Sequence, residues 1–406
     1  MSIARRPETD RRAPDARALP CPCCKEGTLR LFHEVEGVPT NSCILLETRE
    51  EALAWPRGDI RLGFCEACGF ISNTAFDPAL TEYSGRYEET QAFSPTFNRF
   101  HEQLARELVE RHGLQEKDII EIGCGKGEFL HLLCALGDNR GLGYDPGYSE
   151  ERGRALGAGR FEVVRDFFGP DHTERQADFV ACKMTLEHIP TPHDFVDVAM
   201  RVARRPDGVV FIQVPESLRI VRDCAFEDIY YEHCSYFTAG SLARLFERLG
   251  FEVTNTEITY GDQYLTVEAR PAPAGRPAAA GTVADLAALR EAVDRFPETL
   301  RARLAAWSAR LAAWGRDGKR VMIWGSGSKG VSFLATVPGA EVVSHAVDIN
   351  PYRRGYFMAG SGQPILGPED LETTPPDVVI VMNRVYVPEI RETLAEHGLH
   401  PELHAL

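Results

Sequence analysis

The feature that most constrains the fold is a glycine-rich turn placed directly between an apolar strand and a helix. The segment reads DIIEIGCGKGEFL, with a strand predicted over Ile119–Ile122 and glycines at Gly123, Gly125 and Gly127. Glycines let a ligand approach bare backbone at a helix N-terminus, where amide groups have no intrahelical partner. Such a turn is shared by many nucleotide-binding proteins, so alone it predicts a nucleotide-type ligand without identifying it.

Acidic and aromatic side chains follow the next two predicted strands. Asp145 ends the strand in GLGYDP, about twenty residues after the turn, where it can accept hydrogen bonds from ribose hydroxyls. Asp166 and Phe167 end the strand in FEVVRDFF and offer an acceptor and an aromatic face for an adenine. Strands alternate with amphipathic helices from Ile119 to about Ala269, which predicts a mostly parallel sheet. The alternative interpretation is a generic Rossmann-like turn with capping acids.

These residues resemble the class I S-adenosylmethionine (SAM)-dependent methyltransferases. EIGCGKG is similar to their first motif, GYDP to their second and DFF to their third. The resemblance implies an α/β, Rossmann-like methyltransferase domain with SAM as its cofactor. It also implies contacts to the methionine end, the ribose and the adenine from Glu121, Gly123, Gly125, Asp145, Asp166 and Phe167.

A polar and aromatic run, EDIYYEHCSYF, follows the fifth predicted strand of this domain. By the strand-end rule for open α/β sheets, its side chains lie over the same crevice as the cofactor. Tyr230, Glu232 and His233 offer a phenol, a carboxylate and a histidine that could form a proton relay. The alternative is that the aromatic residues pack the following helix, and we adopt it for Tyr236 and Phe237. The loop after the fourth strand adds Glu187 and His188 beside the acceptor.

Two pairs of cysteines near the N-terminus have metal-ligand spacing. CPCC contains Cys21, Cys23 and Cys24, and CEACG contains Cys65 and Cys68. Cys21 with Cys24 reproduces the spacing of the second pair, so these four thiolates predict one tetrahedral Zn²⁺. Because four thiolates leave no open position, we expect a structural ion. The alternatives are buried thiols or a redox pair.

Composition shifts divide the chain into five parts. We predict a disordered tail over 1–16, a zinc-binding module over 17–90, the methyltransferase domain over 91–270, a Pro/Ala/Gly linker over 271–283, and helices plus a second Rossmann-like domain over 284–406. In the last part, WGSGSKG forms another glycine turn. Ser326 and Lys329 could hold a diphosphate there, or the turn could be an emptied cofactor fold kept as a wall of the cleft.

The combination of cysteine pairs, methyltransferase motifs, a Y-x-E-H-x-x-Y-F run and the C-terminal GSGSKG…VDINPYRRGYFMAGSGQPI is similar to one family. It resembles the three-domain C-methyltransferases that act on nucleotide-linked 4-keto-deoxysugars in antibiotic pathways. The resemblance implies an active site of Tyr230, Glu232 and His233, with His233 as base, His188 facing the acceptor, and either Tyr83 or Tyr87 reaching the site. The chain departs from the family at Gly261–Ala269, where GDQYLTVEA replaces a Gly-Gly-Ser turn, and at Arg86–Phe97.

The expected reaction is methylation of a carbon next to a ketone. A hydrogen at that position is acidic enough only when the enolate is stabilised, so a base must work beside a donor. We predict His233 as the base, Glu232 as the group that orients its ring, and Tyr230 or His188 as the donor.

Charge and cysteine usage narrow the alternatives. The 45 basic and 60 acidic residues give a formal charge of −15, which argues against a nucleic-acid partner. Eleven scattered cysteines fit a reducing cytoplasm. The sequence shows no signal peptide and no apolar run that would span a bilayer, so we expect no membrane association. We expect a small-molecule substrate and a monomer or homodimer. The rival functions are C- or O-methylation of another small natural-product intermediate, and a non-catalytic SAM- or nucleotide-binding scaffold.

Overall fold

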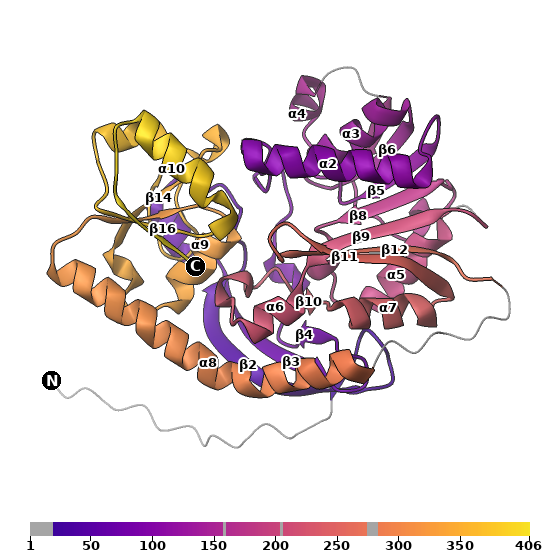
Figure 1. The fold of residues 1–406 in the computed structure, drawn as a ribbon, viewed down its shortest axis with the longest axis horizontal. Helices are drawn as coiled ribbons and strands as arrows, with labels where there is room; N and C mark the ends of the chain where they lie inside the picture. Colours follow the sequence, from indigo (N-terminus) through magenta and orange to yellow (C-terminus); the bar gives the residue numbers. More distant parts are fainter. Residues whose placement is uncertain (1–18, 157–159, 204–205, 274–282) are drawn as a thin grey trace, which may run out of the picture.

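The computed structural model describes residues 19–156, 160–203, 206–273 and 283–406. The predicted tail over 1–16 and residues 274–282 of the predicted linker lie outside the described residues. Three β-sheets follow one another, and a long helix runs beside the first of them (Figure 1). Within the described part of the chain, no helix combines the length and the apolar character needed to cross a bilayer.

The first sheet is antiparallel and has the strand order β1-β2-β3-β4-β10. Its strands are β1 (Leu19–Pro20), β2 (Thr28–Pro39), β3 (Arg57–Cys65), β4 (Ile71–Asn73) and β10 (Ser235–Tyr236). The last of these comes from the polar and aromatic run, because Ser235 pairs with Ser72 and Tyr236 with Ile71. The run is therefore anchored to the cysteine-containing part of the chain.

The second sheet has seven strands in the order β11-β12-β9-β8-β5-β6-β7. The strands are β5 (Asp118–Ile122), β6 (Arg140–Tyr144), β7 (Phe161–Val164), β8 (Phe179–Lys183), β9 (Val209–Pro215), β11 (Phe251–Thr259) and β12 (Tyr264–Pro271). The pairs among β5 to β9 are parallel, as the alternation of strands and helices predicted, whereas β11 and β12 form an antiparallel edge.

Helices cover both faces of this sheet. They are α2 (Pro95–His112), α3 (Glu128–Gly137), α4 (Glu150–Ala155), α5 (Pro192–Arg201), α6 (Ser217–Arg222) and α7 (Ala239–Arg248). In Figure 1, α2 and α3 lie on one face, and α5 and α7 lie on the other. Local chemistry fixes the ends of α2, since the Ser94 side chain caps its first turn and Gly113 ends it at φ 58°. Helix α7 begins at Ala239 because Thr238 is its N-cap.

The third sheet is wholly parallel and has the order β15-β14-β13-β16-β17. Its elements are β13 (Val321–Trp324), α9 (Ser328–Thr336), β14 (Val343–Val347), β15 (Ile365–Leu366), β16 (Val378–Val381), α10 (Val387–Glu396) and β17 (Glu402–Ala405). The remaining helices are α1 (Arg49–Ala54) and the short η1 (Pro78–Leu80), η2 (Pro170–His172), η3 (Leu186–His188), η4 (Phe226–Asp228), η5 (Ala340–Val342), η6 (Pro351–Arg353), η7 (Pro368–Glu372) and η8 (Arg384–Tyr386).

One hydrophobic core joins the first and third sheets. The helical part predicted at the start of 284–406 is a single helix, α8 (Val283–Arg316), which continues through Pro297. Phe296 of α8 shares a buried cluster with Ile60 of β3 and Ile323 of β13. The same cluster contains residues of α6 and of the polar and aromatic run, so this run lies where the three parts of the chain meet.

Candidate functional site

A cavity of about 800 Å³ lies at the carboxyl ends of β5, β6 and β8. Its size is within the usual range for small-molecule sites. Of the predicted site residues, the following line it: Glu121, Gly123, Gly125, Asp145, Asp166, Phe167, Tyr83, Tyr87, His188, Tyr230 and His233. The structure thus brings the predicted cofactor residues and the predicted base to one cavity.

The glycine turn needs its glycines for both conformation and space. Gly123 and Gly125 have φ values of 71° and 56°, in the left-handed region that side chains disfavour. A β-carbon on Gly123 would lie 2.0 Å from Thr185 Oγ1, and one on Gly125 would lie 2.8 Å from Glu89 Oε1. The turn therefore lies directly against the loop after β8 and against the segment that precedes α2.

Asp145 is held by backbone amides on both of its oxygens. Oδ2 accepts from the amide of Gly125 at 2.9 Å and Oδ1 from that of Gly147 at 2.8 Å. Burial raises the pKa of this carboxyl, and the two amide bonds oppose that rise. Each oxygen keeps further acceptor capacity, so a diol at the cavity wall could still bind.

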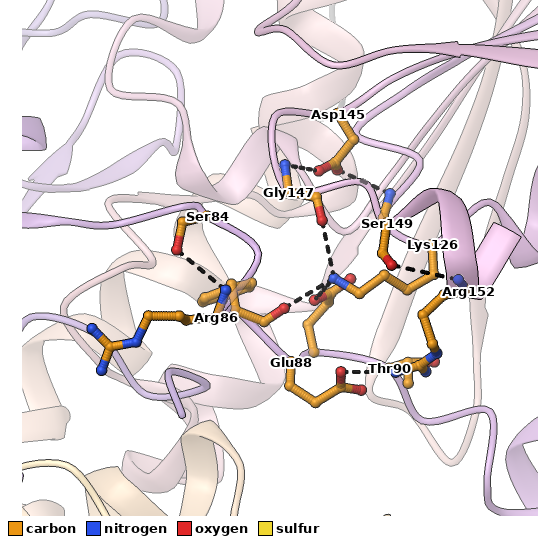
Figure 2. Close-up of polar contacts among 12 residues, drawn as sticks. Ser84, Arg86, Glu88, Thr90, Lys126, Asp145, Gly147, Ser149 and Arg152 are labelled. Carbon is orange, nitrogen blue, oxygen red and sulfur yellow. Dashed lines mark hydrogen bonds and ion pairs between the residues drawn. The ribbon is translucent and has the colours of Figure 1, made fainter. Parts of the chain in front are cut away.

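Tyr87, Glu89 and Thr90 line the larger cavity, and Lys126 ties this segment to the glycine turn. Figure 2 shows Gly147 between Asp145 and Lys126, with Glu88 and Thr90 nearby. Lys126 Nζ donates to the carbonyl oxygens of Tyr87 at 3.0 Å and Gly147 at 3.3 Å. Part of Arg86–Phe97, the segment that departs from the family pattern, therefore helps to form the site. Lys126 stands inside the turn itself but is not among the residues predicted for the site.

Two features fit the ends of a bound SAM. Glu121 is buried, which raises its pKa to about 8, and its Oε2 has no hydrogen-bond partner among the residues described. A carboxyl with free acceptor capacity suits an ammonium group. After β7, Phe167 also lines the cavity; it is 62% exposed, and its amide donates to Asp166 Oδ1 at 2.8 Å. An exposed aromatic face suits a base.

His233 is buried but borders the cavity rather than being closed off from it. Its Nε2 lies 2.6 Å from the hydroxyl of Tyr230 and 3.9 Å from Oε1 of Glu187. The His188 ring lies edge-on, with the two ring centroids 4.9 Å apart. Burial holds the pKa of His233 well below its usual value, so its ring is neutral near neutral pH.

Glu232 does not orient His233, which corrects one part of the predicted relay. Its carboxylate accepts from the Ser42 amide at 2.8 Å, from the Ser42 hydroxyl, and from Asn41 Nδ2 at 3.1 Å. Glu232 and His233 are consecutive in the polar and aromatic run, but their side chains contact different neighbours. The donors for Glu232 come from the N-terminal part of the chain. The carboxylate beside the ring is Glu187.

Both candidate tyrosines reach the site. The Tyr83 hydroxyl lies 2.9 Å from His188 Nδ1, and Tyr87 bonds the Glu232 carboxylate. Burial lowers the pKa of His188 to about 4, so it is also neutral. Glu187, His188 and His233 offer ligand atoms within 4.8 Å of one another, which is a spacing that could hold a metal ion as well.

A smaller cavity of about 240 Å³ adjoins the third sheet and shares Tyr230, His233 and Tyr264 with the larger one. Lys329 lines it, with Nζ 2.6 Å and 2.8 Å from the two oxygens of Asp228. Ser326 lines neither cavity, since its amide and hydroxyl both donate to Asp348. The predicted pair for a diphosphate is therefore largely occupied by protein partners.

The four predicted zinc ligands form one buried cluster. The sulfur atoms of Cys21 and Cys68 lie 3.7 Å apart, as do those of Cys24 and Cys65. Zinc–sulfur bonds of about 2.3 Å in a tetrahedron place the sulfurs about 3.8 Å apart, so the cluster fits the ion. Cys23 is buried but is not part of the group of four.

Comparisons with known proteins agree with this geometry. Residues 97–256 match a family described as a methyltransferase domain, and residues 282–399 match one described as a C-methyltransferase C-terminal domain. C-methyltransferase NovU of Streptomyces niveus is 30% identical over 326 residues, which is 75% of this chain and 76% of that one.

Among solved structures, the chain matches magnesium protoporphyrin IX methyltransferase (ChlM) of Synechocystis PCC 6803 with bound SAH, at 15% identity and a TM-score of 0.35 over 44% of this chain and 84% of that one. It also matches a SAM-dependent methyltransferase from Aquifex aeolicus, at 18% identity and a TM-score of 0.34 over 45% and 95% of the two chains. These likenesses are too low to bear on function.

The seven-stranded sheet, its glycine turn and the family matches define a class I SAM-dependent methyltransferase. The chain belongs to the C-methyltransferase family that includes NovU.

Proposed function

We propose that this enzyme methylates a carbon atom next to the ketone of a nucleotide-linked deoxysugar, through an enolate formed by a protein base. The observation that carries the proposal is that the cofactor residues and the neutral ring of His233 line the same cavity. A C-methyltransferase must hold a proton acceptor and a methyl donor close to the same carbon atom of its substrate. This cavity is our proposed place for both groups.

The side chains around His233 suit enolate chemistry. SAM supplies the methyl group and binds against Glu121, Gly123, Gly125, Asp145, Asp166 and Phe167. His233 takes the proton from the acceptor carbon. Burial keeps Tyr230 protonated by raising its pKa well above the usual value, so its hydroxyl can donate to the developing enolate oxygen. His188 is the second candidate for this donor, and Tyr83 and Tyr87 line the acceptor side.

The smaller cavity is our proposed place for the nucleotide part of the acceptor. It is lined by His233 and by Lys329, Arg219 and Arg353, and the first two of these cations share the carboxylate of Asp228. Tyr264 and Gln263, from the segment that replaces a Gly-Gly-Ser turn, also line it. A sugar at the junction of the two cavities would contact Tyr264, so this residue shapes the acceptor space.

The four cysteines Cys21, Cys24, Cys65 and Cys68 are our proposed ligands of a structural Zn²⁺, within a module over 17–90. The methyltransferase domain over 91–270 and the C-terminal part over 284–406 complete a three-domain enzyme. In this arrangement the ion stabilises the sheet that also contains β10, two residues beyond His233.

The test is methyl transfer from labelled SAM to a 4-keto-deoxysugar nucleotide. His233→Ala should abolish transfer while leaving SAM affinity unchanged. His345→Ala, on β14 and away from both cavities, is the matched control and should remain active. NMR of the product distinguishes C- from O-methylation. Labelling of other small molecules but of no keto-sugar nucleotide would favour the broader methyltransferase function, and SAM binding without turnover on any acceptor would favour a scaffold.

A further inference from the structure

We propose that Glu187, rather than Glu232, is the carboxylate that works with His233, and that it receives the proton that the imidazole removes from the acceptor carbon. This inference rests on the proposed enolate function. It assigns a catalytic role to Glu187, which lies outside the polar and aromatic run.

The position of Glu187 is the first support. Glu187 lies in η3, directly after β8, and its side chain is 2% exposed. Its Oε1 is 3.9 Å from Nε2 of His233, and it lines the larger cavity. A buried carboxyl placed beside an imidazole at the wall of a cavity is the arrangement that a proton relay needs.

Unused hydrogen-bonding capacity is the second support. Apart from the backbone amide of Glu187 itself, neither carboxylate oxygen of Glu187 has a hydrogen-bond partner within the described parts of the chain, and Nδ1 of His233 has none there. Buried polar atoms are nearly always paired, so orphaned atoms clustered at a cavity mark a site that is completed by a ligand. Glu232, by contrast, has donors from Ser42 and Asn41 on both of its oxygens.

The strength of the base is the third support. A histidine whose pKa lies well below its usual value is a weak base for a carbon acid. Burial raises the pKa of Glu187 to about 8, so its ionised form binds a proton much more strongly than the ring does. Lys183 favours the ionised form. The titratable groups around Glu187 are Lys183, Cys182, Tyr83, His188, Tyr230, His233, Cys234 and Tyr264.

The C–H bond next to the ketone breaks, its electron pair forms the enolate, and the proton goes to Nδ1 of His233. Nε2 lies 2.6 Å from the Tyr230 hydroxyl and 3.9 Å from Oε1 of Glu187, so its proton passes to ionised Glu187 through one water molecule or after the pair closes to hydrogen-bond distance around the acceptor. Glu187 becomes neutral, and the ring returns to its neutral form. The enolate carbon then bonds the methyl group, and the sulfonium leaves as a thioether. The protein holds one extra proton, on Glu187, until it is released to water.

The first test needs no acceptor and is therefore independent of the sugar assignment. Infrared difference spectra between pH 6 and pH 9 detect the carbonyl band of a protonated carboxyl group. In the wild type both Glu187 and Glu121 should contribute to a band that titrates near pH 8, and we expect Glu187→Gln to lose the Glu187 part while the Glu121 part remains. Glu227→Gln is the matched control, because Glu227 is also buried with an unpartnered oxygen but borders neither cavity. An identical band in Glu187→Gln and wild type would overturn the proposal.

The second test is the pH dependence of kcat with a working acceptor. Since ionised Glu187 is the active form, wild-type kcat should rise with pH through a limb at or below about 8. Glu187→Gln should lose this limb, and kcat should fall about 100-fold with SAM affinity unchanged. Glu187→Asp should restore a limb, and Glu227→Gln should behave as wild type. A Glu187→Gln enzyme with a wild-type limb, or one that has lost a metal ion held by the wild type beyond the cysteine site, would contradict the relay.

Discussion

The chain contains two strand, glycine-turn and helix units that share a design but differ in what they hold. In the first, between β5 and α3, Asp145 accepts from the Gly125 amide at 2.9 Å. In the second, between β13 and α9, Asp348 accepts from the Ser326 amide at 2.9 Å. In each unit, the aspartate follows the neighbouring parallel strand.

The difference lies in what the polar groups of each turn contact. The first turn faces the cavity of about 800 Å³. The second lines the smaller cavity through Gly325, Gly327 and Lys329, but its polar groups contact protein: Lys329 pairs with Asp228, and Arg353 bonds the carbonyl of Ser326. In the helix that follows, Ser332 Oγ donates to the carbonyl of Ile229 at 2.8 Å. The second unit thus supports the segment that leads to His233. One fold element can serve a ligand in one place and the chain itself in another.

The cysteine cluster also supports the segment that leads to His233. Removing one of its cysteines should cause the largest loss of stability and activity. Cys68→Ser should lose the zinc ion that we propose for this cluster and lower the free energy of unfolding by several kcal/mol, because metal binding contributes folding energy directly. Activity should fall with it, since β4 pairs with β10 close to His233. Cys23→Ser is the control and should keep one zinc ion per chain. Metal analysis and thermal unfolding check this, and a zinc-free Cys68→Ser protein with wild-type stability would refute it.

The comparison of the two turns is tested by paired substitutions of their aspartates. Asp145→Asn should weaken SAM binding by about 10- to 100-fold, because charged hydrogen bonds contribute about 1.5–3 kcal/mol. Asp348→Asn should leave SAM affinity unchanged and lower only the thermal stability. Calorimetric titration measures both. Equal losses of affinity in the two variants would mean that the second turn also contributes to cofactor binding.

A smaller loss of stability should follow from removing the ion pair between Lys329 of the second turn and Asp228. Burial alone would raise the pKa of Asp228, but Lys329 and Arg219 hold it at about 2. A lowered pKa stabilises the fold above the unfolded value of about 4, and this contribution is lost as pH falls toward 2. Lys329→Met should therefore destabilise the protein by about 2 kcal/mol at pH 7.

The difference between Lys329→Met and wild type should shrink between pH 4 and pH 2, as measured by urea unfolding. Lys319→Met, which removes an exposed pair with Glu402, should change little at any pH. A constant difference across this pH range would show that Lys329 acts through packing rather than through charge.

The features that the sequence predicted well are local in the chain. The glycine turn, Asp145 and the cysteine pairs each depend on residues within a few positions, and the resulting class I fold is confirmed by the family matches. The features it missed depend on distant contacts. Glu232 bonds Ser42, 190 residues away, and Glu187 reaches His233 across two loops. No periodicity encodes such pairings, because they arise only when separate sheets pack together.

Ser235 and Tyr236 complete the N-terminal sheet from within the methyltransferase part of the chain. Recombination that exchanges the cysteine-containing portion between relatives as a cassette would leave this two-residue strand facing a foreign edge. Hybrid enzymes should therefore gain from transferring residues 226–237 together with the incoming cassette. The part of this chain that must be exchanged together is then a pair of separate segments rather than one contiguous block.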